Sequence, residues 1–456
     1  MVTAGSGLPS AFEHLPLMAL HVVAPVYVLA SVLALALLLR PRRVVPSRWW
    51  PLVAVVASIG AAIGGLAAWY VGDVQNAFGV SPTWVDRLWA GGVVAGLGVV
   101  VLNLVLGRAG RRVVAGVAVV GFVLAGALAI NQDAGEFVTP GQLLGTDTIP
   151  RLVIPAASPS AASPGSAPAG TVGGLASAWR TPPGLPGAGR LGTVHIPGLA
   201  SHFAARDAIV YLPPAALVPN APALPVVILL SGQPASPTTV VTSGHLPETL
   251  DALAAKHGGL APIVVVPDQL GPHSANPMCV DGPLGNSATY ILGDVTTWIG
   301  THLHVERDRR DWAIGGFSQG GTCALQFATA HPETFGSFID VSGERYPTLA
   351  NDRLAIEKGF GGSTAAFDRA KPAAIMAAHG PYDDLFGFFA VGADDAKYTR
   401  NTEIMTRLSV DAGITVERFA VPHAGHDWTT ATQGFAHGLA AIYPRLGLGG
   451  KAATGE

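Results

Sequence analysis

The sequence predicts an α/β domain, with a mainly parallel sheet flanked by helices, preceded by a four-helix transmembrane domain. Three observations predict this architecture: long apolar segments in the first third, a stretch of Pro, Ala, Ser and Gly, and alternating strand and helix patterns in the second half. The 456 residues are 49% hydrophobic and only 12% charged, which is more apolar than an ordinary soluble protein. The net charge of −3 gives no basis for a nucleic-acid partner.

Each apolar segment of the first third is about as long as a helix that spans the hydrocarbon core of a bilayer. None contains Lys, Arg, Asp or Glu between its ends. The segments are Leu17–Leu39, Leu52–Val71, Leu88–Leu106 and Val113–Ile130. We therefore expect residues 1–132 to form a multi-pass anchor in the cell membrane.

The basic residues of this anchor predict its orientation. They are concentrated in the loops after the first and third segments: Arg40, Arg42, Arg43 and Arg48, then Arg108, Arg111 and Arg112. Cytoplasmic loops are enriched in Lys and Arg, so we expect both loops in the cytoplasm. The N-terminus and everything after the fourth segment, including the α/β domain, are then expected on the extracellular side.

His21 and Asn103 are the polar exceptions inside the apolar segments. Polar groups in a membrane can mark a transport pathway, or they can form an interhelical hydrogen bond or lie at a segment end. We favour the second interpretation, which makes the bundle an anchor and not a transporter.

Composition changes twice after the anchor. Residues 133–190 are expected to form a linker rich in Pro, Ala, Ser and Gly, because such a stretch cannot bury enough apolar surface to offset the entropy of ordering. Residues 191–446 are expected to form the α/β domain. Residues 447–456 are expected to be a flexible tail.

Strand-like and helix-like patterns alternate in this domain. The strand-like runs are Gly192–Ile196, Ala208–Leu212, Pro225–Ser231, Pro262–Val266, Trp312–Gly315, Ser337–Val341, Phe388–Val391 and Thr415–Val421. The helical stretches are Thr289–His302, Gly320–Ala330, Thr399–Ala412 and Thr430–Tyr443. Alternation of this kind predicts a parallel sheet with right-handed crossovers. In such sheets functional residues lie at the carboxyl ends of the strands.

The stretch Gly316-Phe-Ser-Gln-Gly320 lies between a predicted strand and a predicted helix. This G-x-S-x-G pattern is typical of a nucleophile elbow, in which a sharp turn lifts the serine hydroxyl out of the backbone. We therefore predict that Ser318 is a nucleophile. The backbone amide of Gln319 would then face the developing negative charge. The alternative is an ordinary glycine-rich turn.

Acid and base candidates follow in the order that this fold requires. Asp395 lies three residues after Gly392, and the adjacent Asp394 is the alternative acid. His426 precedes a predicted helix and is the expected base, whereas His423 is expected to stabilise the loop. A serine site explains these residues better than a zinc site does, so we expect neither a metal nor a cofactor.

Two further features bear on the site. Gln233 follows a buried strand and is the predicted second oxyanion amide, since Pro234 has no N–H; a simple turn is the alternative. Cys279 and Cys323 lack metal-ligand spacing. Outside the cytoplasm a disulfide between them is permitted, and the alternative is two buried free thiols.

Four motifs together resemble the esterase D / mycolyltransferase family of α/β hydrolases, from about Leu191 to Leu446. They are Gly316-Phe-Ser-Gln-Gly-Gly321, Ala330–Gly343, Val391-Gly-Ala-Asp-Asp395 and Gly425-His-Asp-Trp428. The resemblance implies an α/β-hydrolase fold with Ser318 as nucleophile, Asp395 or Asp394 as acid and His426 as base. It also implies an oxyanion hole made by the amides of Gln233 and Gln319.

A multi-helix anchor before such a domain is similar to membrane-anchored actinobacterial relatives in the cell envelope. The chain departs from secreted mycolyltransferases in keeping this anchor and in having Gln319 where they have an apolar residue. We expect a membrane-anchored extracytoplasmic serine esterase acting on an ester or acyl-lipid substrate. The alternatives are an acyltransferase that moves an acyl group to a cell-envelope sugar, and a catalytically inactive binding or scaffold domain.

Overall fold

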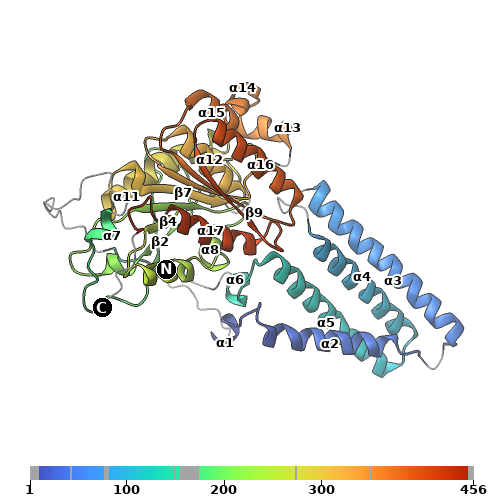
Figure 1. Cartoon of the computed structure of the whole chain (residues 1–456). Coiled ribbons are helices and arrows are strands. Elements are labelled where there is room, and N and C mark those ends of the chain that lie inside the picture. Colours follow the sequence, from blue (N-terminus) through green and yellow to red (C-terminus); the bar gives the residue numbers. More distant parts are fainter. Residues whose placement is uncertain are drawn as a thin grey trace. The chain divides into compact units, whose positions relative to one another are not determined.

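The computed structural model describes residues 10–41, 44–75, 82–144, 146, 149–154, 174–272, 275–349 and 351–449 (Figure 1). The chain divides into two compact units, Met1–Thr148 and Ile149–Glu456. Each unit is described separately.

The described residues of unit 1 form four helices that are long and apolar enough to cross a membrane. They are α2 (Leu20–Leu38), α3 (Pro46–Trp69) with its π-helical extension η1 (Tyr70–Val74), α4 (Trp84–Leu106) and α5 (Ala109–Ala134). Short helices α1 (Ser10–Glu13) and α6 (Pro140–Leu144) flank them. Helix α4 contacts both α3 and α5, and α2 contacts α5. These helices confirm the predicted transmembrane half of the fold.

Helices α3 and α4 approach each other through glycines. A Cβ atom added at Gly60 would lie 2.7 Å from the Cα of Ala95, and one added at Gly64 would lie 2.4 Å from the carbonyl oxygen of Ala90. Small residues let the backbones of membrane helices come this close, so that dispersion forces hold the pair together.

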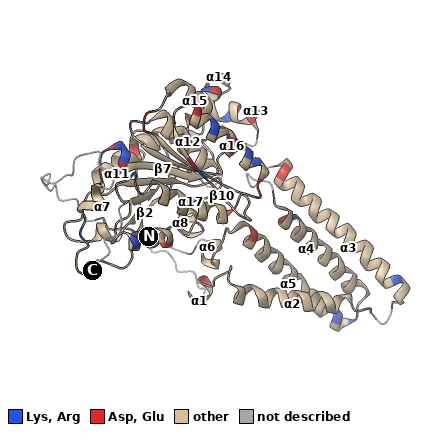
Figure 2. Cartoon of the chain, viewed as in Figure 1, with Lys and Arg blue, Asp and Glu red and all other residues tan. Residues whose placement is uncertain are grey.

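Charged residues gather at the two ends of unit 1. Figure 2 shows Lys and Arg at the end formed by the α2–α3 and α4–α5 connections, and acidic residues at the opposite end. Arg87 is the basic residue at the acidic end, where it pairs with Asp73 at 2.8 Å. Arg42 and Arg43 lie outside the described residues.

Asn103 makes structural contacts within unit 1. Its side chain is fully buried and donates to the carbonyl oxygen of Leu37 in α2 at 3.2 Å. Arg111 donates to the Asn103 side-chain oxygen and to the same Leu37 carbonyl. His21 is exposed near the start of α2. These contacts support the interpretation of Asn103 as an interhelical hydrogen-bonding residue.

Unit 2 is built on an eight-stranded sheet with the order β1-β2-β4-β3-β7-β8-β9-β10. Strand β2 pairs antiparallel with β1 and β4, and every other neighbouring pair is parallel. The strands are β1 (Arg190–Val194), β2 (Ala208–Leu212), β3 (Val226–Leu230), β4 (Ile263–Val266), β7 (Trp312–Phe317), β8 (Ser337–Val341), β9 (Phe386–Gly392) and β10 (Thr415–Val421). Strands β5 (Asp281–Gly282) and β6 (Gly285–Asn286) form a separate small hairpin.

Helices cover both faces of this sheet (Figure 1). The helices in the described part of unit 2 are α7 (Gly174–Ala178), α8 (Pro237–Thr242), α9 (Leu246–Lys256), α10 (Ser287–Thr289), α11 (Thr296–His302), α12 (Gln319–Ala330), α13 (Asp352–Leu354), α14 (Thr364–Arg369), α15 (Pro372–His379), α16 (Ala396–Asp411) and α17 (Trp428–Ile442). The chain also forms the 3-10 turns η2 (Pro214–Leu217) and η4 (Arg309–Asp311) and the π-helical turns η3 (Tyr290–Val295) and η5 (Ala355–Gly359).

Strand β8 shows how the two faces are assigned. Asp340 lies against Gly321 of α12, whereas Ile339 and Val341 lie against glycines of α17. Successive side chains of a strand point to opposite faces, so α12 and α17 pack on opposite sides of the sheet. All five residues of β8 are buried, as expected for a strand covered on both faces. The observed sheet and helices confirm the predicted α/β-hydrolase fold.

Parts of the segment predicted as a linker over residues 133–190 are folded. Leu152 donates its N–H to the carbonyl of Thr193 in β1 at 2.9 Å and is only 8% exposed. Trp179 donates its indole N–H to the carbonyl of Gly258 at 2.9 Å. These apolar side chains have surface to bury, unlike the low-complexity run between them, of which residues 155–173 lie outside the described residues.

The predicted tail of residues 447–456 also begins inside the fold, because the side chain of Leu448 is fully buried in the core. Residues 450–456 lie outside the described residues.

Candidate active site

Ser318 occupies a sharp turn between β7 and α12. Its φ of +58° and ψ of −120° lie in a region that a residue with a Cβ rarely adopts. The Ser318 N–H donates to the carbonyl of Val341 in the neighbouring strand β8 at 2.8 Å, which ties the turn to the sheet. The serine is thus held at the carboxyl end of a central strand.

The two flanking glycines are required by close backbone contacts. A Cβ atom on Gly316 would lie 2.3 Å from the carbonyl carbon of Gly320. One on Gly320 would lie 2.4 Å from the carbonyl oxygen of Leu230 in β3. Any side chain at either position would therefore open the turn, which explains the spacing of the G-x-S-x-G pattern.

The structure brings His426 to Ser318. His426 lies in the loop between β10 and α17, and its Nε2 is 2.8 Å from the Ser318 Oγ. The imidazole stacks on Tyr398 with 3.8 Å between ring centroids and on Phe317 with 4.8 Å. His423 is exposed elsewhere on the same loop.

Asp395 is the acid that faces this imidazole. Its Oδ2 is 4.0 Å from the His426 Nδ1, which is longer than a hydrogen bond. Its Oδ1 accepts the backbone N–H groups of Lys397 and Tyr398 and so caps α16. Asp394 is exposed. Among the described residues, Asp395 is the acid that lies within ion-pair distance of His426.

His426 is held in its neutral form. Its side chain is 7% exposed, and its Nδ1 has no hydrogen-bond partner among the described residues. Burial, reinforced by the Lys397 ammonium, lowers the pKa of His426 to about 3. A neutral imidazole can accept the proton of a neighbouring hydroxyl, which is the property that a general base needs.

Sequence reasoning missed two polar residues beside this pair. Tyr398 donates its hydroxyl to the Glu344 Oε1 at 3.2 Å, and its ring stacks on the His426 imidazole. Glu344 accepts a second hydrogen bond, from the Thr322 hydroxyl, at 2.6 Å. Burial, followed by the Glu344 carboxylate, raises the pKa of Tyr398, so the phenol stays protonated.

A positional signal could have identified Glu344. It lies three residues beyond the end of β8, at the sheet edge where functional residues gather. Tyr398 has no comparable signal, because it lies in the first turn of α16. Its approach to Ser318 depends on how that helix packs.

The predicted oxyanion segments adjoin Ser318. Gln319 is the first residue of α12, so its backbone N–H has no partner within the helix. Gly232, in the loop after β3, lies close enough that an added Cβ would be 3.2 Å from the Ser318 Cβ. Gln233 follows Gly232 directly and precedes Pro234 across a cis peptide bond.

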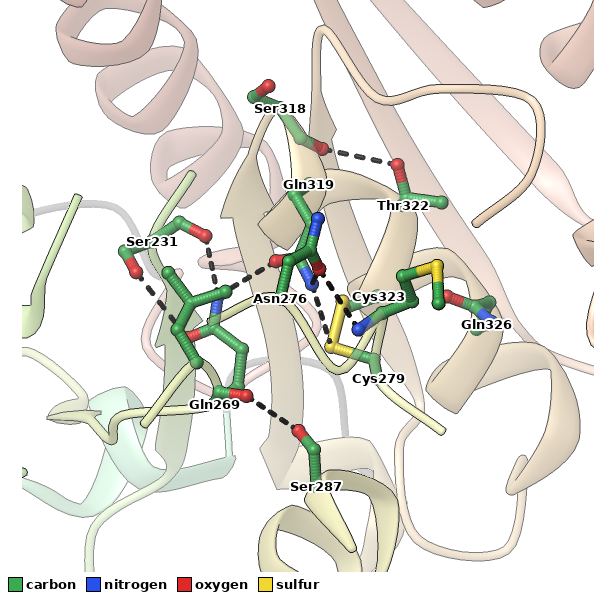
Figure 3. The surroundings of a disulfide bond; sticks show 12 residues. Ser231, Gln269, Asn276, Cys279, Ser287, Ser318, Gln319, Thr322, Cys323 and Gln326 are labelled. Carbon is green, nitrogen blue, oxygen red and sulfur yellow. Dashed lines mark hydrogen bonds between the residues drawn. A yellow bond between two sulfur atoms is a disulfide. The ribbon is translucent and has the colours of Figure 1, made fainter. Parts of the chain in front are cut away.

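Cys279 and Cys323 are joined by a disulfide, and both are buried. Cys323 lies on α12 behind the elbow, and Cys279 lies in the loop that precedes β5 (Figure 3). The described residues contain no group of three His, Cys, Asp or Glu side chains that could hold a metal ion.

Comparison with known proteins finds a relative in Corynebacterium glutamicum, an uncharacterized protein that is 36% identical over 238 residues. The matched region is 51% of this chain and 56% of that protein, so the chain spans little more than half of the length of this relative.

Several solved structures are similar to this chain over more than half of its length. A ferulic acid esterase is 18% identical, with 56% of this chain and 97% of that chain covered and a TM-score of 0.48. An S-formylglutathione hydrolase from Agrobacterium tumefaciens is 20% identical, with coverages of 57% and 97% and a TM-score of 0.49. MPT51 of Mycobacterium tuberculosis is 19% identical, with coverages of 55% and 97% and a TM-score of 0.41.

The model of the Esterase family matches residues 204–446. This range contains the elbow, the Asp395 loop and the His426 loop, and it confirms the family resemblance inferred from the four motifs. Because the match covers more than half of the sequence, this chain belongs to the Esterase family.

Proposed function

We propose that this protein is a membrane-anchored serine esterase that cleaves carboxylic esters through an acyl-enzyme. The observation that carries the proposal is the 2.8 Å contact between Ser318 Oγ and His426 Nε2 on a nucleophile elbow. A hydroxyl becomes a useful nucleophile when an adjacent base can take its proton during attack.

In the first half of the proposed reaction, His426 Nε2 takes the Ser318 proton while Oγ attacks the ester carbonyl carbon. The backbone amides of Gln233 and Gln319 stabilise the tetrahedral oxyanion, each donor contributing roughly 3 kcal/mol to the transition state. Collapse of this intermediate breaks the bond to the leaving oxygen, and the proton on His426 passes to the departing alcohol.

In the second half, a water molecule loses a proton to His426 and attacks the acyl carbonyl. The second tetrahedral intermediate then releases the acid and returns the proton to Ser318. Asp395 would stabilise the imidazolium in both halves, which requires its Oδ2 to approach Nδ1 from the present 4.0 Å.

We further propose that unit 2 lies outside the cytoplasm. Two independent features support this location. The arginine-rich connections of unit 1 are expected in the cytoplasm, which leaves the chain after α5 on the other side. The disulfide between Cys279 and Cys323 is of a kind that persists in oxidising compartments.

The test uses the full-length protein in detergent micelles with short p-nitrophenyl esters as substrates. We expect Ser318→Ala to lower kcat by roughly 10⁴-fold or more, because the nucleophile is lost. Ser409→Ala is the matched control, since Ser409 is also a buried serine but lies on α16 with its hydroxyl directed at Met376. It should retain turnover.

Labelling with a fluorophosphonate probe complements the assay. Wild type should be labelled and Ser318→Ala should not be. Undiminished turnover by Ser318→Ala would refute the proposal. Absence of both turnover and labelling in folded wild-type protein would favour the inactive binding domain instead. Transfer of the acyl group to an added sugar, with little free acid released, would identify an acyltransferase.

A further inference from the structure

A chain of buried amide side chains connects the two predicted oxyanion segments. Figure 3 shows Gln269 between Ser231 on one side and Gln319 on the other, with the disulfide next to Gln319. Ser231 and Gln269 are completely buried, and Gln319 is 7% exposed. The proposed reaction uses the elbow and the Ser318–His426 contact, and none of its steps uses the side chains of this network.

Gln269 makes both of the central contacts. It lies just after β4, and its Nε2 donates to the Ser231 carbonyl oxygen at 2.6 Å and to the Gln319 Oε1 at 3.0 Å. Its own backbone carbonyl accepts the Ser287 hydroxyl at 2.7 Å, which fixes the position of the residue. Both N–H groups of this side-chain amide are therefore used inside the protein.

The contacts continue from Gln319 to the disulfide loop. The Gln319 Nε2 donates to the Asn276 Oδ1 at 3.3 Å and lies 3.6 Å from the Cys279 sulfur. Asn276 in turn donates to the carbonyl of Thr348 at 3.2 Å. Cys279 is bonded to Cys323 on α12, the helix that begins with Gln319. The loop containing Asn276 and Cys279 is thus fixed to the nucleophile helix at two points.

The two ends of the Gln269 bridge are the segments that would supply the oxyanion amides. Ser231 is two residues before Gln233, and Gly232 between them lies close enough to Ser318 that an added Cβ would be 3.2 Å from the Ser318 Cβ. Gln319 contributes its own backbone N–H. We propose that Gln269 is a positioning residue that fixes the distance between the two oxyanion donors, with the disulfide loop as the outer support. This inference rests on the proposed esterase function.

The physical reason is that an oxyanion hole acts only when its donors are already in place. Such donors stabilise charge that develops in the transition state, so an error in their position lowers kcat more than it weakens substrate binding. Displacements of about 1 Å in a site can cost roughly 10²-fold in rate. A buried amide that holds one backbone carbonyl and one side chain in place restricts such displacements.

The central experiment compares Gln269→Met with Gln326→Met in the full-length protein in detergent. Methionine has a similar length and no N–H groups. Gln326 is a matched control because it is also buried, lies on α12 and donates to the backbone carbonyl of Ala370, away from Ser318. Thermal unfolding of each variant measures how far its stability has changed.

For Gln269→Met we expect kcat to fall roughly 10- to 100-fold, with KM within about threefold. The affinity for a trifluoromethyl ketone, which forms a tetrahedral adduct, should fall by a similar factor. Gln326→Met should keep kcat within about twofold. A role in packing alone would lower the stability of both variants without this selective loss of kcat.

A second variant keeps the inference testable if Gln269→Met does not fold. Gln319→Met breaks the same link from the other side while leaving the Gln319 backbone N–H in place, and it should lower kcat in the same selective way. The double variant Cys279→Ala/Cys323→Ala should show a smaller loss with the same signature, because the inner bridge remains.

The outcomes separate this inference from the proposed function. Wild-type kcat in folded Gln269→Met or Gln319→Met, together with an inactive Ser318→Ala, would overturn the role of Gln269 and leave the esterase proposal standing. Full activity of Ser318→Ala would overturn both.

Discussion

The two sides of the His426 imidazole differ in how they are held. Nε2 lies 2.8 Å from Ser318 Oγ, whereas Nδ1 has no hydrogen bond in the described part of the chain and lies 4.0 Å from Asp395. The contact between His426 and the nucleophile is therefore already formed in this structure. A hydrogen bond to the acid would require Asp395 Oδ2 to move closer to Nδ1. The stacked rings of Tyr398 and Phe317 hold the imidazole in the meantime.

This difference follows from the origin of each contact. The elbow is built by consecutive residues between β7 and α12, where glycines and a backbone hydrogen bond to β8 leave little freedom. The acid contact joins two loops, one after β9 and one after β10. Asp395 is fixed through Oδ1 as the cap of α16, so its Oδ2 can turn toward Nδ1 without loss of the cap. Such contacts often tighten only when substrate binds.

The strongest test of the acid side is Asp395→Asn. We expect kcat/KM for p-nitrophenyl esters to fall by about 10²- to 10⁴-fold, because a neutral amide neither stabilises the imidazolium nor selects the correct tautomer. The asparagine oxygen can still cap α16, so the thermal unfolding temperature should change little. The measurement is steady-state kinetics of the full-length protein.

Asp394→Asn is the matched control for this substitution. Asp394 is adjacent in sequence but exposed, and its removal should change kcat/KM by no more than about twofold. A large fall in kcat/KM for Asp394→Asn, with normal kcat/KM for Asp395→Asn, would identify Asp394 as the acid in place of Asp395. If neither variant lost activity, His426 would be oriented by its aromatic neighbours alone.

The pH dependence of kcat/KM tests whether the His426 imidazole is neutral when it acts as the base. The base must be neutral, and the pKa of His426 is lowered to about 3 by burial and by Lys397. A histidine with an ordinary pKa of about 6.5 would lose roughly 30-fold in activity by pH 5. We instead expect kcat/KM to change by less than about twofold between pH 7 and pH 5. An acid limb centred at or above pH 6.5 would contradict this.

The lowered pKa of His426 also means that the folded protein becomes less stable as the pH falls. Between pH 6.5 and pH 3 the unfolded chain binds a proton at His426 that the folded chain does not. The free energy of unfolding therefore receives its full contribution from this group above pH 6.5 and loses it as the pH falls toward 3.

The smallest expected effect concerns the phenol on the nucleophile side. Tyr398→Phe keeps the ring that stacks on His426 and removes the hydroxyl that donates to Glu344. We expect kcat to fall about fivefold, equivalent to the loss of one hydrogen bond worth ~1 kcal/mol. Tyr382→Phe, which removes a buried hydroxyl bonded to the Thr329 carbonyl, should leave kcat unchanged. Equal kcat in both variants would argue against a role for Tyr398 beyond packing.

The features that local patterns specify could be predicted from the sequence. The membrane helices follow from the length of uninterrupted apolar runs. The elbow follows from two glycines at positions where any side chain would collide with the neighbouring backbone. The sheet followed from continuous apolar strands. Ser318, Asp395 and His426 could be proposed because each ends or follows a strand on one edge of such a sheet.

What could not be predicted depends on contacts between distant segments. Gln269 and Tyr398 look like ordinary loop and helix residues, and their partners lie 38 residues away at Ser231 and 54 away at Glu344. The short helices α8 and α13 carry too few apolar residues to give a helical period. Residues 149–154 could not be separated from the predicted linker, because six residues that include Pro150 and Arg151 are too few to show a strand or helix period beside a run of Pro, Ala, Ser and Gly.

The glycine contact between α3 and α4 imposes a requirement of another kind. Replacing Gly60 or Gly64 by any larger residue would force two backbones apart, although both positions belong to unit 1 and the candidate active site belongs to unit 2. A mutational screen that scores only the amount of protein in the membrane would detect these two sites and overlook Ser318. A screen that scores colour from a chromogenic substrate would detect all three, and the comparison of the two screens would separate residues that build the protein from residues that act.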